Sequence, residues 1–342
     1  SLNAKLGNLR KQYRSIAMMV HPDHVDHGQQ SLAHDVFNSL TMMYEQAKNA
    51  LEKDVYDAKF SVKSTNTFVL EAGAQTYTLN EDVSYEGDFS DVHIGYAVDK
   101  KQVYAKVALD PTYNQYLEHE AVIYKSMNAA GATATLRYVP ELLDSLLVEL
   151  GGSRKVRVNV FRHEDGYVSL TEVHKQYPKG LHPKDAAWIW RRVLGQTLTA
   201  SMHNVVHGAM VPDHTLVHPV SHNPYYIGWT HSIVDPEGTS NRLTTRVDRW
   251  NEWYPEEVLN RKVPTHATDV YMAGKTMVYL LGGDVKSNSM SKAVPREIQK
   301  IVRDCVSLDS DSRSHGYEVL QMFTKTIHGL WGKEYRELKM SK

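Results

Sequence analysis

Two apolar stripes at helical spacing dominate the first sixty residues. Residues 10–20 place apolar side chains every three or four positions: Tyr13, Ile16, Ala17 and Val20. Proline removes a backbone donor and fixes φ, so His21-Pro22-Asp23 is expected to end this helix. A second stripe covers residues 31–51: Phe37, Leu40, Tyr44, Ala47 and Leu51. The pattern predicts two antiparallel helices joined by a polar loop.

Strand-like alternation begins near Phe68 and continues to residue 160. Three strands are predicted, at Tyr77–Leu79, Val92–Val98 and Val103–Leu109, and a helix follows over residues 114–127. Residues 142–160 supply two more strands around the Gly-Gly-Ser-Arg-Lys turn at 151–155. This part of the chain is therefore expected to be rich in β-structure.

From residue 186 onward the chain is expected to be mainly helical. Residues 186–206 form a long helix with a predicted buried face: Trp188, Val193, Leu194, Leu198 and Met202. A polar loop opened by His207-Gly208 follows, and then two short strands, Thr215–His218 and Tyr225–Trp229, around an Asn-Pro turn. The predicted fold class is α+β, with a small helical hairpin before a β-rich and then an α-rich part.

Composition and charge narrow the classes of partner. The 342 residues are 42% hydrophobic, enough for more than one domain core, and the formal net charge is −1. A charge this close to zero gives no reason to expect nucleic acid or a membrane surface as partner. One cysteine, Cys305, fits a reducing compartment, and the chain has neither a long apolar run nor a signal-peptide pattern, so a cytoplasmic protein is expected. His21, His24 and His27 are grouped on a polar loop, where imidazoles are usually solvated, so no metal is expected.

The first helix and the loop after it carry a recognisable motif. Residues 13–23, YRSIAMMVHPD, are followed by Phe37, Leu40, MYEQA at 43–47 and VYDAKF at 55–60. This combination resembles a J domain, the module of DnaJ-type co-chaperones. The resemblance implies that a DnaK-type ATPase chaperone is contacted by His21, Pro22 and Asp23. It also implies a basic docking face made of Arg10, Lys11 and Arg14.

The N-terminal match departs from the J-domain pattern in three places. The family's first helix is nearly missing, reduced to SLNAKLG at 1–7, and His24 replaces the usual lysine after the HPD tripeptide. The second helix lacks the family's basic residues. The alternative is a hairpin retained for structure, in which the tripeptide only stops a helix.

A second set of motifs spans residues 68–330: Gly87 in YEGDFSDV, Lys106 in VYAKVAL, Glu120 in LEHEAVIY, His207 in VVHGAM, Tyr254-Pro255-Glu256, Asp269 in DVYMAGK, and Arg313. Together they resemble the protein-kinase fold, which has a β-rich and an α-rich lobe. The resemblance implies a Lys106–Glu120 pair, and it implies that Asp269 caps the backbone of the catalytic loop. It also implies that Arg313 pairs with Glu256.

The positions that carry kinase chemistry are replaced in this chain. Ala209 stands where that pattern has the catalytic aspartate, His214 where it has the metal-binding asparagine, and Gly228 where it has the DFG aspartate. Asp88 and Asp91 bring negative charge to the loop that would approach phosphates. The resemblance therefore implies a pseudokinase that disfavours ATP, with no cofactor expected.

The predicted boundaries are a J-like domain at 1–61, a linker at 62–67, a β-rich lobe at 68–166, an α-rich lobe at 167–335 and a tail at 336–342. Three functions stay open. The chain could be a co-chaperone or scaffold that binds a client or partner protein and recruits a DnaK-type chaperone. It could be a divergent nucleotide-dependent transferase that uses Lys106 with carboxylates such as Asp213 or Asp235. It could also be a purely structural assembly subunit.

Overall fold

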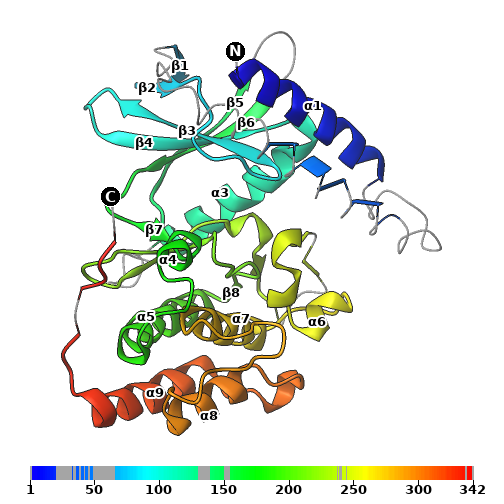
Figure 1. Cartoon of the computed structure of the whole chain (residues 1–342). Helices are drawn as coiled ribbons and strands as arrows, with labels where there is room; N and C mark the ends of the chain where they lie inside the picture. The colour runs from blue at the N-terminus through cyan, green and yellow to red at the C-terminus, as the bar shows by residue number, and fades with distance from the viewer. Residues whose placement is uncertain are drawn as a thin grey trace. The chain divides into compact units, whose positions relative to one another are not determined.

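The structure is a computed structural model. It describes residues 2–20, several positions between 33 and 48, and residues 66–129, 139–149, 155–236, 238, 241–243, 245–335 and 337–340. The chain divides into two compact units, Ser1–Ser64 and Thr65–Lys342. The second unit is a mixed α/β structure that combines a curled antiparallel sheet with helices (Figure 1).

The first unit contains one long helix, α1, at Leu2–Val20. Residues 2–9 continue the predicted helix by two further turns, so the expectation of a helix that begins at Arg10 is wrong. The ring of Tyr13 stacks on that of Tyr44 at 4.4 Å, and the Tyr13 hydroxyl shares a hydrogen bond of 3.0 Å with Thr41 Oγ1. The described positions between 33 and 48 are helical, as the second stripe predicts. His21, Pro22 and Asp23 lie outside the described residues.

Six strands of the second unit form one antiparallel sheet in the order β1-β2-β3-β4-β6-β5. Their bounds are β1 Thr67–Ala72, β2 Gln75–Asn80, β3 Ser90–Ala97, β4 Gln102–Ala108, β5 Leu142–Glu149 and β6 Lys155–Arg162. The predicted strands are confirmed here, and β1 is an additional edge strand. The sheet curls, and the curl brings β2 close enough to β5 for the Tyr77 hydroxyl to donate a hydrogen bond to the Asp144 carboxylate.

Strand β4 shows how the alternation builds this sheet. Val103, Ala105 and Val107 are buried in an apolar core inside the curl. Side chains alternate between the two faces of a strand, so Tyr104 and Lys106 lie together on the opposite face. Helix α3, Asn114–Ala129, follows a short 3₁₀ turn and packs on that face.

The helices of the second unit gather at the other end from the sheet (Figure 1). They are α4 Leu170–Gln176, α5 Pro183–Met202, α6 Glu256–Leu259, α7 His266–Leu280, α8 Arg296–Cys305 and α9 Gly316–Trp331. Helix α5 packs between α7 and α9: Trp190 donates from Nε1 to the Ala273 carbonyl at 2.6 Å and meets Phe323 edge to face. Met202 was expected on the buried face of α5, but it is 68% exposed, because it lies on the same stripe of the helix as the half-buried Arg191, Gly195 and Leu198.

Short strands frame the loop that follows α5. Strand β9, Thr215–Val217, pairs with β10, Pro224–Tyr226, and with β7, Val168–Ser169. The predicted hairpin is confirmed, but its second strand ends at Tyr226, and Trp229–His231 form a 3₁₀ turn instead. Strand β8, Val205–Val206, pairs with β11, Ile233–Val234, and the two strands bracket the whole loop.

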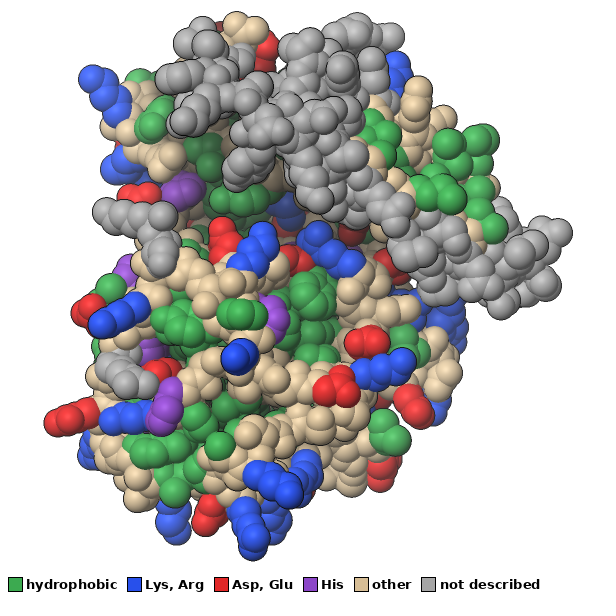
Figure 2. Space-filling view, in the orientation of Figure 1, with side chains coloured by type: hydrophobic (Ala, Val, Ile, Leu, Met, Phe, Trp, Pro, Cys, Tyr) green, Lys and Arg blue, Asp and Glu red, His purple; other side chains and the backbone are tan. Residues whose placement is uncertain are grey.

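Surface charge on this unit is mixed in sign. On the face in Figure 2, Lys and Arg side chains alternate with Asp and Glu over the helices, in keeping with the formal net charge of −1. Within the part of the chain that the structure describes, none of the helices has the length and apolar character needed to cross a bilayer.

Candidate functional site

Asp269, in the first turn of α7, holds the loop that follows β8. One carboxylate oxygen accepts the His207 backbone N–H at 2.7 Å, and the other accepts the Gly208 N–H at 2.9 Å. Burial raises the pKa of Asp269 to about 7, and the two amides oppose that rise. Gly208 has a φ of +70°, and a Cβ there would stand 3.1 Å from the His231 carbonyl oxygen. The predicted cap on the loop backbone is confirmed.

His207 itself is a buried packing residue in this loop. Its Nδ1 accepts a hydrogen bond from the Ala209 N–H at 3.2 Å, and its ring meets Trp229 edge to face at 4.5 Å. Burial lowers the pKa of His207 well below its usual value, and the charges of His214 and His231 act in the same direction. The imidazole is therefore neutral at physiological pH and supports the loop through its shape and one hydrogen bond.

The three replaced positions lie together beside His207. Ala209 is fully buried, and its carbonyl accepts a hydrogen bond of 3.1 Å from His214 Nδ1. Gly228 has a φ of +82°, and a Cβ added there would lie 2.5 Å from the same His214 nitrogen. The His214 ring therefore fills the space that any side chain at position 228 would need. The resemblance to the kinase fold grouped these three positions, but it did not show that a side chain at position 228 and the His214 ring exclude each other.

Two neutral imidazoles, those of His214 and His231, lie at this point of the site. The rings of His214 and His231 lie 5.9 Å apart. Burial is the main cause that lowers the pKa of His214 to about 3 and that of His231 to about 4, and the positive charge of Lys106 lowers both further. Mg²⁺ prefers oxygen ligands in octahedral geometry, which these residues do not offer. Among the described residues, no group of three His, Cys, Asp or Glu side chains is placed to hold a metal ion.

Lys106 and Glu120 form the predicted ion pair across β4 and α3. Lys106 Nζ lies 2.6 Å from Glu120 Oε1, with the carboxylate almost fully buried. Asn159 on β6 donates to the other Glu120 oxygen at 3.2 Å and to the Leu117 carbonyl at 2.8 Å. Removing one partner of such a pair leaves an uncompensated buried charge, at a cost of about 3–5 kcal/mol. The pair fixes α3 to the sheet.

Aromatic rings crowd the sheet face that carries Lys106. Tyr104, two residues before Lys106, stacks on Phe161 at 5.0 Å, and Phe161 meets Tyr124 of α3 at the same distance. Burial raises the pKa of Tyr104 well above its usual value, and nearby Tyr225 adds to the shift. Tyr104 was not among the site residues expected from the sequence. It could have been found from the strand alternation, which puts Tyr104 on the same face of β4 as Lys106.

The loop between β2 and β3 folds back on the sheet. The N–H groups of Ser84 and Tyr85 both donate to the Val92 carbonyl, at 2.8 and 3.3 Å. Gly87 allows the tight return, because a Cβ there would lie 2.5 Å from the Ser90 carbonyl oxygen. These two amides are therefore committed within the loop and do not point to a phosphate position.

Phe89 closes the same loop against the site. Its ring stacks on Tyr116 of α3 at 4.7 Å and contacts His231 at 5.7 Å. Asp91, one of the two aspartates expected to repel phosphates, is buried on β3. An aromatic side chain thus spans from the loop to α3 and to the 3₁₀ turn.

Helix α3 is also attached to the segment after Gly228. His119 donates from Nε2 to the Ser232 carbonyl at 2.6 Å, and Ser232 Oγ donates to the His207 carbonyl at 3.3 Å. Tyr124 contacts Trp229 at 6.1 Å. The Lys106 pair, the loop beside Ala209 and this segment are therefore connected through α3.

Asp213 and Asp235, the two carboxylates considered for an alternative chemistry, have other partners. Asp213 accepts from Thr171 Oγ1 at 2.7 Å, from the Arg249 guanidinium at 2.8 Å and from the Trp250 indole. Asp235 accepts from the Asn204 side-chain amide at 3.0 Å in the turn after β11. Both carboxylates are held in structural contacts.

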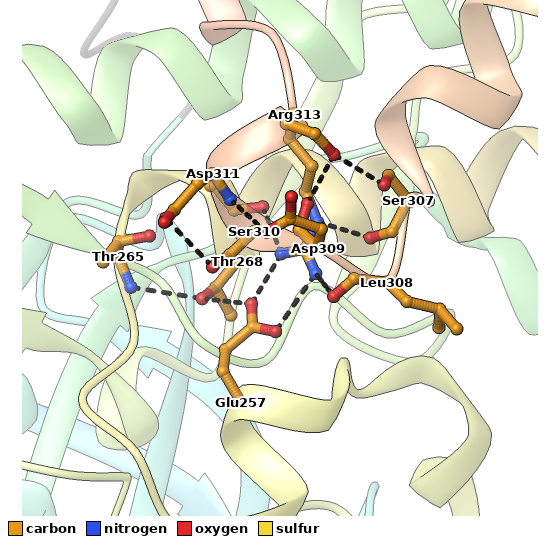
Figure 3. A network of polar contacts seen from close by, with 11 residues as sticks. Glu257, Thr265, Thr268, Ser307, Leu308, Asp309, Ser310, Asp311 and Arg313 are labelled. Atoms are coloured by element: carbon orange, nitrogen blue, oxygen red, sulfur yellow. Dashed lines mark hydrogen bonds and ion pairs between the residues drawn. The ribbon is translucent and has the colours of Figure 1, made fainter.

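Arg313 makes a buried double ion pair with Glu257 (Figure 3). Its two terminal nitrogens lie 2.5 and 3.0 Å from the Glu257 oxygens, and Thr268 Oγ1 donates to the same carboxylate at 3.2 Å. The prediction that Arg313 pairs with Glu256 is wrong by one residue, because the partner is Glu257. Glu256 begins α6 with its side chain in solvent, whereas the helical turn directs Glu257 inward.

The residues of the predicted basic face on α1 are among the described residues, whereas His21, Pro22 and Asp23 are not. Lys11 is exposed and Arg14 is half-buried, whereas Arg10 retains only 9% of its accessible surface. Of the three predicted docking side chains, Lys11 is the most open to solvent.

No protein-family model matches the chain, and no curated protein matches it. The function therefore has to be argued from the residues and their geometry.

Proposed function

We propose that residues 68–335 form a catalytically inactive, two-lobed kinase-like module that binds a client or scaffold protein. The J-type hairpin at 1–61 recruits a DnaK-type chaperone to that partner through His21, Pro22 and Asp23, in the cytoplasm. In this proposal the module is a protein-binding surface, and the chaperone supplies the ATPase activity.

One observation carries the proposal for the second unit. Asp269 still holds the His207 and Gly208 amides, while the neighbouring positions are Ala209, His214 and Gly228. Phosphoryl transfer requires positioned Mg²⁺ and a base near the nucleophile. Removing a single stabilising group from a preorganised site costs about a hundred- to a thousandfold in rate. A scaffold kept without its reacting groups fits binding better than catalysis.

The chaperone contact rests on the sequence motif and on the exposed Lys11 of α1. The direct test is single-turnover ATP hydrolysis by a DnaK-type chaperone, with this chain and with its His21→Gln variant. We expect the unaltered chain to stimulate ATP hydrolysis by the chaperone and the His21→Gln variant not to stimulate it. His27→Gln, a change of the same chemistry outside the tripeptide, is the matched control and should stimulate normally. Equal hydrolysis rates with all three proteins and with the chaperone alone would contradict the proposal.

A nucleotide-dependent transferase is the second candidate, and the intact Lys106–Glu120 pair is the observation that favours it. A ligand that binds only the folded state stabilises it and raises the melting temperature, increasingly so as its concentration exceeds the Kd. The melting temperature measured with ATP, with and without Mg²⁺, separates the two functions. We expect no shift, because Tyr104 and Phe161 crowd the face beside Lys106 and Ser84 and Tyr85 have committed their amides. If the chain neither stimulates the chaperone ATPase nor is stabilised by ATP, a purely structural role becomes the best explanation.

A further inference from the structure

A segment after α9 returns along the helical end of the second unit. We call it the strap; it comprises Gly332–Tyr335 and Glu337–Met340. Gly332 has a φ of +71°, a left-handed conformation that favours glycine, and it turns the chain away from the axis of α9. Figure 1 shows the chain running from α9 past α5 towards α4 and β7.

Tyr335 is the first anchor of the strap. Its ring lies 5.9 Å from the Trp188 ring and 5.2 Å from the His222 ring. The Arg192 guanidinium lies 5.1 Å from the centre of the Tyr335 ring, within the range of a cation–π contact. The side chain still keeps 43% of its surface exposed, so this anchor rests on the surface rather than within it.

Leu338 is the second anchor, and main-chain hydrogen bonds flank it. Its side chain is 7% exposed and belongs to the main apolar core of the helices. Its N–H donates to the Pro219 carbonyl at 2.9 Å, and the next carbonyl, that of Lys339, accepts from the Tyr177 hydroxyl at 2.6 Å. Anchoring side chains combined with main-chain hydrogen bonds are the way in which extended peptides dock on protein surfaces.

The surface beneath the strap has polar atoms that the strap leaves unsatisfied. Trp188 Nε1 and both ring nitrogens of His222 are buried and have no hydrogen-bond partner among the described residues. Both rings contact Tyr335. A buried polar group without a partner destabilises the structure that buries it. The strap is thus an imperfect occupant, and a segment that supplies a hydrogen-bond acceptor or donor here would bind more favourably.

Most residues of the strap make few buried contacts with the rest of the unit. Lys333, Glu334 and Glu337 are exposed. Among the described residues of the strap, Leu338 is the one fully buried side chain, and Met340 is half-buried against the same core. Segments with few buried apolar contacts open locally at much lower free energy than the core. The strap can therefore leave its surface while the helices stay folded.

We propose that the surface formed by Tyr177, Trp188, Arg192, Pro219 and His222 is a peptide-docking site, which the strap occupies until a partner displaces it. The partner is a protein segment with an aromatic residue followed three positions later by leucine, the spacing of Tyr335 and Leu338. The site lies on α4, α5 and the turn between β9 and β10, so it does not depend on the kinase-like interpretation of the residues around Lys106.

The test uses a fluorescein-labelled peptide with the sequence of residues 332–342, GKEYRELKMSK, and fluorescence anisotropy. The receptors are the unaltered chain, the Leu338→Ala variant, whose own strap is released, and the Lys333→Ala variant as an exposed strap control. A competing strap weakens apparent affinity by the fraction of molecules in which it is open. We expect Leu338→Ala to bind the peptide at least tenfold more tightly than the unaltered chain and Lys333→Ala, which corresponds to a strap open in fewer than about one molecule in ten.

Three results would overturn the proposal. The first is a folded Leu338→Ala chain that does not bind the peptide, or that binds a peptide lacking the leucine equally well. The second is equal affinity of the unaltered and Leu338→Ala chains. The third is a dimer of the unaltered chain that the peptide dissociates, which would make a second copy of this chain the occupant.

Hydrogen exchange on the unaltered chain keeps the proposal testable if Leu338→Ala does not fold. The amide of Leu338, bonded to Pro219, should exchange at least a hundredfold faster than the amide of Phe323 within α9. Exchange of both amides at the same slow rate would show that the strap opens only with global unfolding, and partner displacement would then be excluded.

Discussion

Replacing Asp269 is the most direct test of how this site is built. The carboxylate satisfies two buried N–H groups, those of His207 and Gly208, at 2.7 and 2.9 Å. Asp269→Ala leaves both donors without a partner. Each buried unsatisfied group costs about 1–3 kcal/mol, so we expect a loss of about 4 kcal/mol in the free energy of unfolding. Asp269→Asn retains one acceptor oxygen and should lose about 2 kcal/mol.

Urea denaturation at pH 7.5, followed by tryptophan fluorescence, measures these losses. Glu297→Gln on the exposed face of α8 is the control, and it should stay within about 0.5 kcal/mol of the unaltered chain. A loss below about 1 kcal/mol for Asp269→Ala would refute the argument, because the two amides would then have found other partners. Equal losses for the alanine and asparagine variants would also refute it.

The same residue predicts a pH dependence with a definite sign. The pKa of Asp269 is about 7 in the folded chain because of burial, against about 4 for an unfolded aspartate. The folded state therefore keeps the proton to higher pH, so this group's contribution to stability is full below pH 4 and declines as the pH rises through 7. Asp269→Asn lacks this titration. The stability advantage of the unaltered chain over Asp269→Asn should be larger at pH 5 than at pH 7.5, and an advantage independent of pH would contradict the assignment.

Two further substitutions test single contacts by thermal or urea unfolding. Glu257→Ala should cost about 3–5 kcal/mol because it leaves the Arg313 guanidinium buried without its carboxylate, whereas Glu256→Ala should change stability by less than about 0.5 kcal/mol. Equal effects of the two glutamates would show that the ion pair is not the source of the stability. Gly228→Asp should destabilise the chain by about 1–3 kcal/mol and give no Mg²⁺-dependent rise in melting temperature, because the new Cβ meets the His214 ring. A Mg²⁺-dependent stabilisation of that single variant would show that the imidazole moves aside readily.

Local pattern predicted the elements well and their ends less well. The resemblance to the kinase fold implied that Lys106 pairs with Glu120, and the ion pair is present. Periodicity alone put Met202 on the buried face of α5, although the stripe on which it lies is only half-buried at Gly195 and Leu198. Trp229 was expected in a strand but lies in a 3₁₀ turn, because a buried aromatic residue fits either structure equally well.

The sequence predicted which residues belong to the site, and the structure shows which of them contact one another. The cap of Asp269 on the His207 backbone was expected only from the resemblance to the kinase fold, and the hydrogen bond is present. Two adjacent glutamates could not be separated by sequence, because only the first turn of α6 decides which one faces Arg313. Tyr104 escaped notice because its importance comes from Phe161, which lies on another strand.

The contact between His214 and Gly228 restricts how this site could change over generations. An aspartate at position 228 meets the imidazole, and a metal ligand at position 214 alone faces a glycine that offers no second carboxylate. Each single substitution is therefore harmful or without benefit, and only a chain that carries both has a complete pair of ligands. A pair of carboxylates at positions 214 and 228 is therefore reached only when both residues change together, which is a consequence of one steric contact.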